Sequence, residues 1–161
     1  MKSVKPAGPV SMLMRSTPRL RHKRIFIDSS AWIAYMLKGE PNHQAVFDYL
    51  TGEIRLKSKL FTSDYVLDET FTRLLNTQGI TTVKKFKTHL SLTEKQGQLL
   101  VFWTDETLFT RSWPLFQKFA EHKLSFTDVT IFTLAKDFKL DEVLSLDQGF
   151  KKVGLTVRPL L

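Results

Sequence analysis

Two carboxylates stand at positions where acidic residues are unusual. Asp128 heads an apolar stripe at the i, i+3, i+4, i+7 spacing of one helix face, made with Ile131, Phe132 and Ala135. Asp147 ends the apolar run EVLSLD. Because acids are kept off core faces unless a partner compensates their charge, both positions indicate a functional site.

Each of these two acids also has a plain structural explanation. Ser125 and Asp128 match the S-x-x-D pattern of a capping box, in which the two residues satisfy the first backbone amides of a helix. Asp147 precedes a Gln-Gly pair and can be a turn residue. Taken singly, neither position distinguishes structure from function.

Two further acids belong to the candidate set. Asp28 follows the apolar strand-like run RIFI and precedes a helix, where it can serve as an N-cap. Glu69 flanks the apolar stripe of another helix and stands four residues before Arg73, the spacing of an exposed ion pair. Its neighbour Asp68 competes for any role given to Glu69.

The combination of acids is more informative than any member. Carboxylates gathered at one edge of a sheet repel one another and raise each other's pKa unless a cation lies among them. Oxygen-only ligands suit Mg²⁺ or Mn²⁺. Such a cation activates water and stabilises the charge of a phosphodiester under attack. With no cysteine and only four histidines, the chain favours this chemistry over zinc chemistry.

The elements that must position these acids alternate along the chain. The predicted strands are 24–28, 56–62, 98–104, 142–146 and a last one within 155–161. The predicted helices are 29–39, 41–52, 63–79, 81–97, 105–122 and 126–138, with Gly52 ending the second and Pro114 bending the fifth. This alternation predicts an α/β fold with a mainly parallel sheet, which binds ligands beyond the carboxyl ends of its strands. Asp28 and Asp147 both occupy such ends.

Composition limits the class of protein. A chain of 161 residues with 42% hydrophobic residues is long enough for one domain with a packed core. The absence of cysteine excludes disulfides, thiolate zinc sites and cysteine nucleophiles. No apolar run approaches the ~20 residues of a membrane span.

The positive charge is concentrated at the start of the chain. Residues 1–24 hold seven basic residues and no acid, whereas residues 25–161 hold 17 basic and 16 acidic residues, so the net charge of +8 describes mainly this segment. We expect residues 1–23 to be a disordered basic tail and residues 24–161 to form the domain. A transit peptide, a start at Met12 or Met14, and contact with RNA are all compatible with such a tail.

Four segments together resemble a known family. RIFIDSSAW, TSDYVLDETFTRLL, LSFTDVTIFTLAKD and VLSLDQGFKKVGL resemble, in order, the successive motifs of PIN-domain ribonucleases, including VapC-type toxins. The resemblance implies a PIN-like three-layer sandwich and a metal-dependent endoribonuclease that hydrolyses RNA. It implies that Asp28, Glu69, Asp128 and Asp147 are the catalytic and metal-binding acids, with Mg²⁺ or Mn²⁺ as the cofactor. Ser29, Ser125 and Thr127 resemble the polar residues that flank this site.

The resemblance also implies partners. We expect an RNA substrate, an antitoxin protein, a homodimer, a cytoplasmic location and no membrane association. The aromatic residues of the first two helices, Trp32, Tyr35, Phe47 and Tyr49, can form a dimer face or an antitoxin groove, or can simply belong to the core.

Other functions stay open at this point. Phosphoryl-transfer enzymes that use an aspartyl phosphate also place acids at strand ends, but the dehalogenase-like class needs a second aspartate where Ser30 stands. A housekeeping RNA-processing nuclease and a non-catalytic RNA- or protein-binding module of the same fold are the remaining alternatives.

Overall fold

A computed structural model describes residues 22–160. Its centre is a five-stranded sheet with the order β3-β2-β1-β4-β5, in which every neighbouring pair is parallel. The strands are β1 (Arg24–Ile27), β2 (Lys59–Ser63), β3 (Leu99–Phe102), β4 (Glu142–Leu144) and β5 (Val157–Arg158). The predicted α/β class with a parallel sheet is confirmed.

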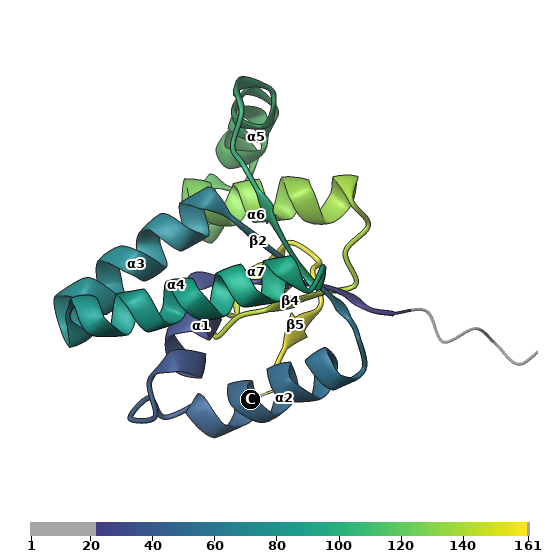
Figure 1. The fold of residues 1–161 in the computed structure, drawn as a ribbon. Coiled ribbons are helices and arrows are strands. Elements are labelled where there is room, and N and C mark those ends of the chain that lie inside the picture. The colour runs from purple at the N-terminus through teal and green to yellow at the C-terminus, as the bar shows by residue number, and fades with distance from the viewer. Residues whose placement is uncertain (1–21, 161) are drawn as a thin grey trace, which may run out of the picture.

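Helices cover both sides of this sheet. They are α1 (Ser29–Met36), α2 (His43–Arg55), α3 (Asp64–Gln78), α4 (Ile80–Lys95), α5 (Glu106–Lys118), α6 (Phe126–Asp137) and the short α7 (Gly149–Lys152), with a 3-10 turn at Ala120–His122. Figure 1 shows α2 and α6 on opposite sides of the sheet, α3 and α4 as a packed pair, and α5 standing beyond α6. None of the described helices has the length and apolar character needed to span a membrane.

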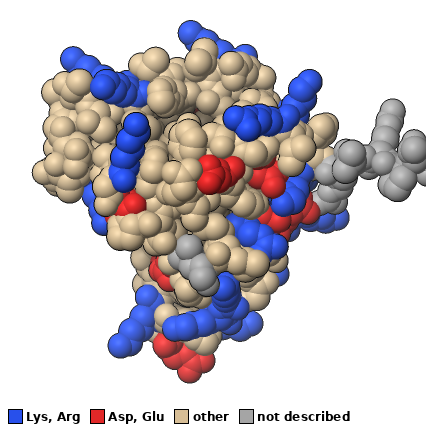
Figure 2. All heavy atoms as spheres, turned by 90° about the horizontal axis from the view of Figure 1, so that it is seen from below, with Lys and Arg blue, Asp and Glu red and all other residues tan. Residues whose placement is uncertain are grey.

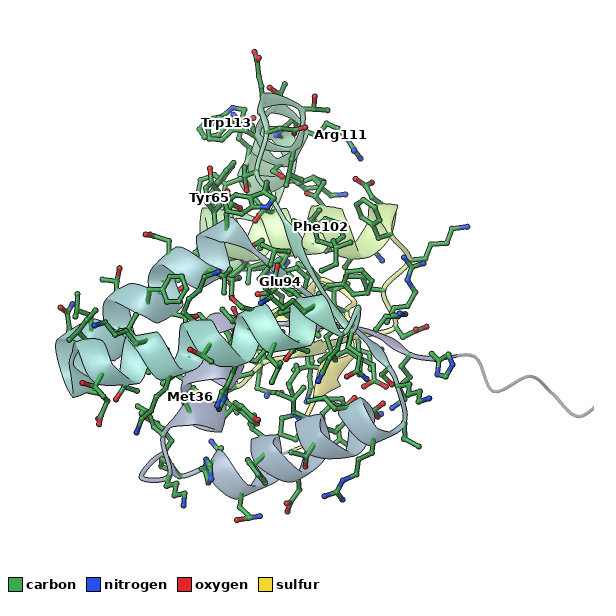
Figure 3. The ribbon with its side chains drawn as sticks, viewed as in Figure 1. Met36, Tyr65, Glu94, Phe102, Arg111 and Trp113 are labelled. Atoms are coloured by element: carbon green, nitrogen blue, oxygen red, sulfur yellow. The ribbon has the colours of Figure 1, made fainter. Side chains whose placement is uncertain are left out.

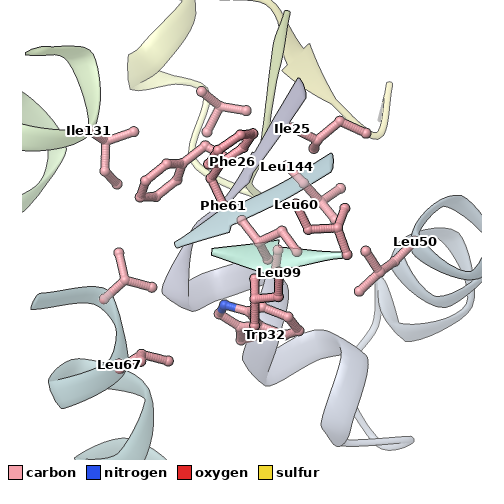
Figure 4. Packing of buried hydrophobic residues seen from close by; sticks show 14 of the residues in the cluster. Ile25, Phe26, Trp32, Leu50, Leu60, Phe61, Leu67, Leu99, Ile131 and Leu144 are labelled. Atoms are coloured by element: carbon pink, nitrogen blue, oxygen red, sulfur yellow. The ribbon is translucent and has the colours of Figure 1, made fainter. Parts of the chain in front are cut away.

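The strands alternate between two apolar faces. Ile25 pairs in register with Leu60, and Leu60 with Leu99, so these three side chains share one face, while Phe26 and Phe61 share the other. Figure 4 shows the two phenylalanines directed toward α6 and the aliphatic side chains directed toward α2. A fully buried side chain of this size contributes about 2 kcal/mol to folding, so both helical layers are held by the sheet.

The aromatic residues of α1 and α2 differ in burial: Trp32 belongs to the core, Tyr35 and Tyr49 pack against it, and Phe47 is exposed. Trp32 is buried and donates its indole N–H to Thr62 Oγ1 at 3.2 Å. Tyr35 stacks on Phe47 with ring centroids 5.6 Å apart, and Phe47 remains 38% exposed. The core alternative therefore holds for Trp32, while a dimer or antitoxin contact through the outer rings stays a prediction.

Several element boundaries differ from the expectations: α1 ends at Met36 rather than Gly39, and α5 at Lys118 rather than His122. Gly52 does not end α2, which continues to Arg55 because half-buried Ile54 packs against the core. β2 begins at Lys59 rather than Leu56, since Lys57 adopts a left-handed backbone (φ 57°) that interrupts an extended run. α7 was not predicted, and Pro114 lies inside α5.

The surface of the described domain carries no single basic patch on the face shown in Figure 2. Lys and Arg are scattered over this face, which is the lower side of Figure 1 and carries α2. The lysines of the KKFK segment are exposed around buried Phe86, as expected for a solvated helix face. Most of the predicted tail lies outside the described residues.

The strand order creates one position for a ligand. β1 lies between β2 and β4, and the chain leaves β1 toward β2 but returns to β4 only after β3. In open α/β sheets, ligands bind outside the carboxyl ends of the strands where the strand order reverses in this way. The segments that follow β1 and β4 carry Asp28 and Asp147.

Candidate active site

Asp28 is a buried carboxylate held by hydroxyl groups. It is 5% exposed and precedes α1, yet its side chain makes no capping hydrogen bond, so the N-cap explanation fails for the carboxylate. The hydroxyls of Ser30 and Ser145 each donate to Asp28 Oδ2 at 2.8 Å, and Ser29 makes a longer contact of 3.4 Å to Oδ1. These bonds fix the direction of a charge that water would otherwise solvate.

Asp128 both caps its helix and interacts with the other aspartates. Ser125 and Asp128 form the predicted capping box, with bonds of 2.8 and 3.1 Å. Burial raises the pKa of Asp128 to about 6 against the opposing bonds from Ser125, and the charges of Asp28 and Asp147 push the pKa in the same direction as burial. The three aspartates therefore interact electrostatically across one site.

Asp147 lies in the exposed turn after β4. Its backbone N–H donates to Ser145 Oγ at 2.9 Å, and its Oδ1 accepts from the Gly149 N–H at 2.7 Å, so the turn explanation is confirmed. A side chain at Gly149 would bring Cβ to 2.9 Å from Leu124 Cδ2 and 3.0 Å from Asp147 Oδ1. A side chain at this position would therefore displace the Leu124 or Asp147 side chain, which the glycine leaves in place.

Glu69 lies in a hollow next to these aspartates rather than among them. It is exposed and lines an open hollow of about 580 Å³ together with Tyr65, Arg73 and Thr127. Thr127 directly precedes Asp128, so the hollow reaches the part of α6 that carries Asp128. Within the described part of the chain, no ion pair joins Glu69 to Arg73, and Glu69 is not among the charges that raise the pKa of Asp128.

The chemical type of the ligands at this site, which are carboxylates, suits a hard divalent cation. The charges of Asp28 and Asp147 raise the pKa of Asp128, so a positive charge among the three would be favourable, and all the donors are oxygen. As the side chains stand, however, no three His, Asp or Glu residues of the described chain are close enough to hold a metal ion by themselves. A bound ion would need water among its ligands, which Mg²⁺ commonly keeps.

Two polar residues of the site were not singled out from the sequence. Ser30 and Ser145 lie within 3.2 Å of each other and both hold Asp28, and Ser30 Oγ also accepts from the Leu146 N–H at 3.0 Å. They join the segments that follow β1 and β4. Two signals in the sequence were available. Both residues are small, and Ser30 stands two residues after Asp28, while Ser145 stands two residues before Asp147.

A further acid at a strand end has a structural role. Asp64 follows β2, and its carboxylate accepts from both the backbone N–H and the hydroxyl of Thr104, at 3.1 and 2.8 Å. These bonds hold the segment after β3 against the start of α3. Asp64 is therefore committed to this loop.

Comparisons with known proteins agree with this arrangement. The sequence matches the PIN domain family over residues 25–155. The fold is similar to that of VapC20 of Mycobacterium tuberculosis, described as a sarcin-ricin loop cleaving toxin, with a TM-score of 0.73 and 24% sequence identity over 84% of this chain and 99% of that chain. No curated protein sequence matches the chain.

Proposed function

Because the chain belongs to the PIN domain family, we propose that it is a metal-dependent endoribonuclease and the toxin of a toxin–antitoxin pair. The observation that carries the proposal is the meeting of Asp28, Asp128 and Asp147 beyond the carboxyl ends of β1 and β4. The strand order predicts a ligand at these ends of β1 and β4. A cation there would offset the repulsion among the three carboxylates.

In this proposal, Asp28, Asp128 and Asp147 hold Mg²⁺ or Mn²⁺ directly or through water, and Glu69 contributes from the adjoining hollow. The cation supplies an activated water and stabilises the charge of the attacked phosphodiester. Ser30 and Ser145 keep the Asp28 carboxylate pointed at the site. Asp128, with its raised pKa, must lose its proton before it can act as a ligand.

The substrate class follows from the same site. An open hollow beside the acids, lined by charged, polar and aromatic residues, suits an extended polynucleotide chain better than an enclosed small molecule. VapC20 is described as cleaving the sarcin-ricin loop, so this RNA loop is the first specific substrate to test. Such a toxin would act on RNA in the cytoplasm.

The test is cleavage of a mixed RNA pool and of a sarcin-ricin loop RNA by the purified full chain. We expect cleavage with Mg²⁺ or Mn²⁺, none with EDTA, and none by Asp28→Asn or Asp128→Asn at unchanged helical content. Equal cutting in EDTA, or a fully active Asp28→Asn protein, would contradict the proposal. Metal-independent binding of RNA without cleavage would favour the non-catalytic binding module.

A further inference from the structure

We propose that the hollow along α3 binds the RNA strand next to the cleaved bond, with Arg73 taking a phosphate and Tyr65 stacking on a base. This inference rests on the proposed function, because it assigns the substrate contacts of that same site. It concerns side chains that the four acids leave unexplained.

One stripe of α3 forms the hollow. Tyr65, Glu69, Arg73 and Asn76 recur at helical spacing and all line it, and Thr127 closes it on the side of Asp128. α3 begins directly after β2, at the edge of the sheet that carries the acids, and Arg73 lies one helical turn beyond Glu69. The hollow therefore leads along α3 away from the acids.

Arg73 is available for a ligand. Its guanidinium is exposed, and within residues 22–160 it forms no ion pair, although Glu69 stands at the spacing that commonly gives one. A guanidinium binds phosphate oxygens in a bidentate manner and with more specificity than an ammonium group. An arginine beside a group of acids is attractive to a polyanion that those acids alone would repel.

Tyr65 offers a ring that is already positioned. It is half-buried at the start of α3, and its ring lies 6.5 Å from that of Phe126 on α6, which in turn contacts Phe109 of α5 at 4.9 Å. Figure 3 shows Tyr65 at the end of α3 that lies beneath α5. Aromatic side chains fixed in this way are platforms on which the bases of single strands stack without sequence preference.

The test measures RNA binding in EDTA, so that it does not depend on chemistry. For the full chain with a short labelled single-stranded RNA, we expect Arg73→Ala to weaken binding about tenfold at low salt and to reduce the salt slope by about 0.7, the contribution of one phosphate. Arg73→Lys should restore the slope and part of the affinity. Tyr65→Leu should weaken binding at least about fivefold, whereas Tyr65→Phe should not.

The matched control is Arg55→Ala. Arg55 is also an exposed arginine at which no ion pair is found within the described chain, but it ends α2, which leads into the start of β2 at the opposite edge of the sheet. Loss of the same charge there should leave affinity within about twofold and the salt slope within error. Equal effects of Arg55→Ala and Arg73→Ala, or no effect of either, would overturn the inference.

The outcomes separate the two proposals. RNA binding that depends on Arg73 and Tyr65 without any metal-dependent cleavage would support the hollow as a binding site and refute the nuclease. Metal-dependent cleavage with unchanged binding in Arg73→Ala and Tyr65→Leu would support the nuclease and refute this inference.

Discussion

The Asp28 carboxylate lies in a buried position where hydroxyl groups replace water around it. Ser30 and Ser145 both donate to the same carboxylate oxygen, Oδ2. Asp128 lacks such compensation beyond its own cap, and its pKa rises to about 6. The two acids therefore differ in role before any cation binds: the Asp28 carboxylate is fixed by its bonds, whereas Asp128 takes up or releases a proton near neutral pH.

Asp68 and Glu69 are neighbours on α3, and the first prediction separates them. Both are exposed and line the same hollow, and the resemblance to PIN ribonucleases assigns the site role to Glu69. We expect Glu69→Gln to lower the cleavage rate and to raise the Mg²⁺ concentration needed for half-maximal activity, by about 10-fold or more. Asp68→Asn, the matched loss of charge, should change both by less than about twofold; the reverse order would move the role to Asp68.

The raised pKa of Asp128 gives a prediction for stability without metal. Its folded-state pKa is about 6, and its unfolded value is about 4. Between these pH values the folded protein holds a proton on Asp128 that the unfolded chain has lost. The contribution of this proton to the free energy of unfolding is therefore fully present below about pH 4 and is lost as pH rises through about 6. After solvent screening of this partly exposed group, we expect a loss of about 1 kcal/mol in the free energy of unfolding.

Denaturant unfolding of the wild type and of Asp128→Asn in EDTA, from pH 4 to pH 7, measures this effect. Asparagine can still accept the Ser125 N–H bond but does not titrate, so the variant should gain stability relative to the wild type as pH rises. Parallel pH curves for the two proteins would show that Asp128 does not titrate in this range.

At the scale of elements, one partly buried ion network joins the residue before β1 to α2 and β4 at the edge opposite the acids. Lys23 Nζ lies 2.8 Å from Glu53 Oε1 and 3.0 Å from Glu142 Oε1, and Tyr49 donates to Glu142. Burial raises the pKa of Glu53, but the bonds from Lys23 and Ser58 outweigh it and hold that pKa below its ordinary value. Lys23 thus belongs physically to the domain, although the sequence analysis assigned it to the tail.

The network predicts that Lys23→Met destabilises the domain. Glu53 and Glu142 are 6% and 8% exposed, and without Lys23 the first would lose its counter-charge. We expect a loss of about 2 kcal/mol at pH 7, less than for a fully buried pair because Lys23 is itself partly exposed. The loss should shrink in acid, as pH falls through the lowered pKa of Glu53 and its carboxylate takes up a proton. Lys87→Met, on the exposed face of α4, is the control, and equal unfolding free energies for the two variants would contradict the prediction.

The sequence predicts the long elements because their apolar period is strong, and it fails where tertiary contacts decide. α2 runs past Gly52, since a glycine costs only about 1 kcal/mol in a helix and the residues after it reach the core and Lys23. α7 has only four residues, too few for a helical period. The start of β2 depends on the left-handed backbone of Lys57, which no local pattern indicates.

The candidate site was predictable to a similar extent. Asp28, Asp128 and Asp147 stand at strand and helix ends that the alternation of elements brings together, so their meeting follows from the sequence. The environment of Glu69 did not follow, because the i,i+4 spacing to Arg73 allows an ion pair, whereas both side chains line an open hollow. Ser145 was harder to assign, since its bond to Asp28 spans 117 positions and only its place two residues before Asp147 pointed to the site.

For the whole molecule, the distribution of charge determines how partners approach. Residues 25–161 are nearly neutral, with 17 basic and 16 acidic residues, and the basic side chains in Figure 2 are scattered. Exposed aromatic side chains remain on the domain, among them Trp103 at 75% and Trp113 at 48%. A protein partner would therefore bind this domain mainly through apolar contacts rather than through a complementary charged surface.

The last prediction concerns control of the activity by such a partner. A ribonuclease whose acids are already assembled would damage its own cell unless it were restrained. An arginine or lysine of a partner protein can enter the acidic site and compete with the metal, because three mutually repelling carboxylates attract any cation. We therefore expect expression of the chain alone to arrest growth, and an Asp128→Asn copy at the same protein level to leave growth unchanged.

Co-expression of an antitoxin should restore growth. In the purified complex the antitoxin should block access of metal and RNA to the acids, so that nuclease activity returns only after the antitoxin is removed. The complex should also need more Mg²⁺ for half-maximal activity than the isolated chain, since the partner's basic group and the metal exclude each other. Growth that continues unchanged at verified levels of the active wild type would contradict the toxin function. Combined with metal-dependent cleavage in vitro, that result would assign the chain to housekeeping RNA processing, because the same site would then be harmless without a restraining partner.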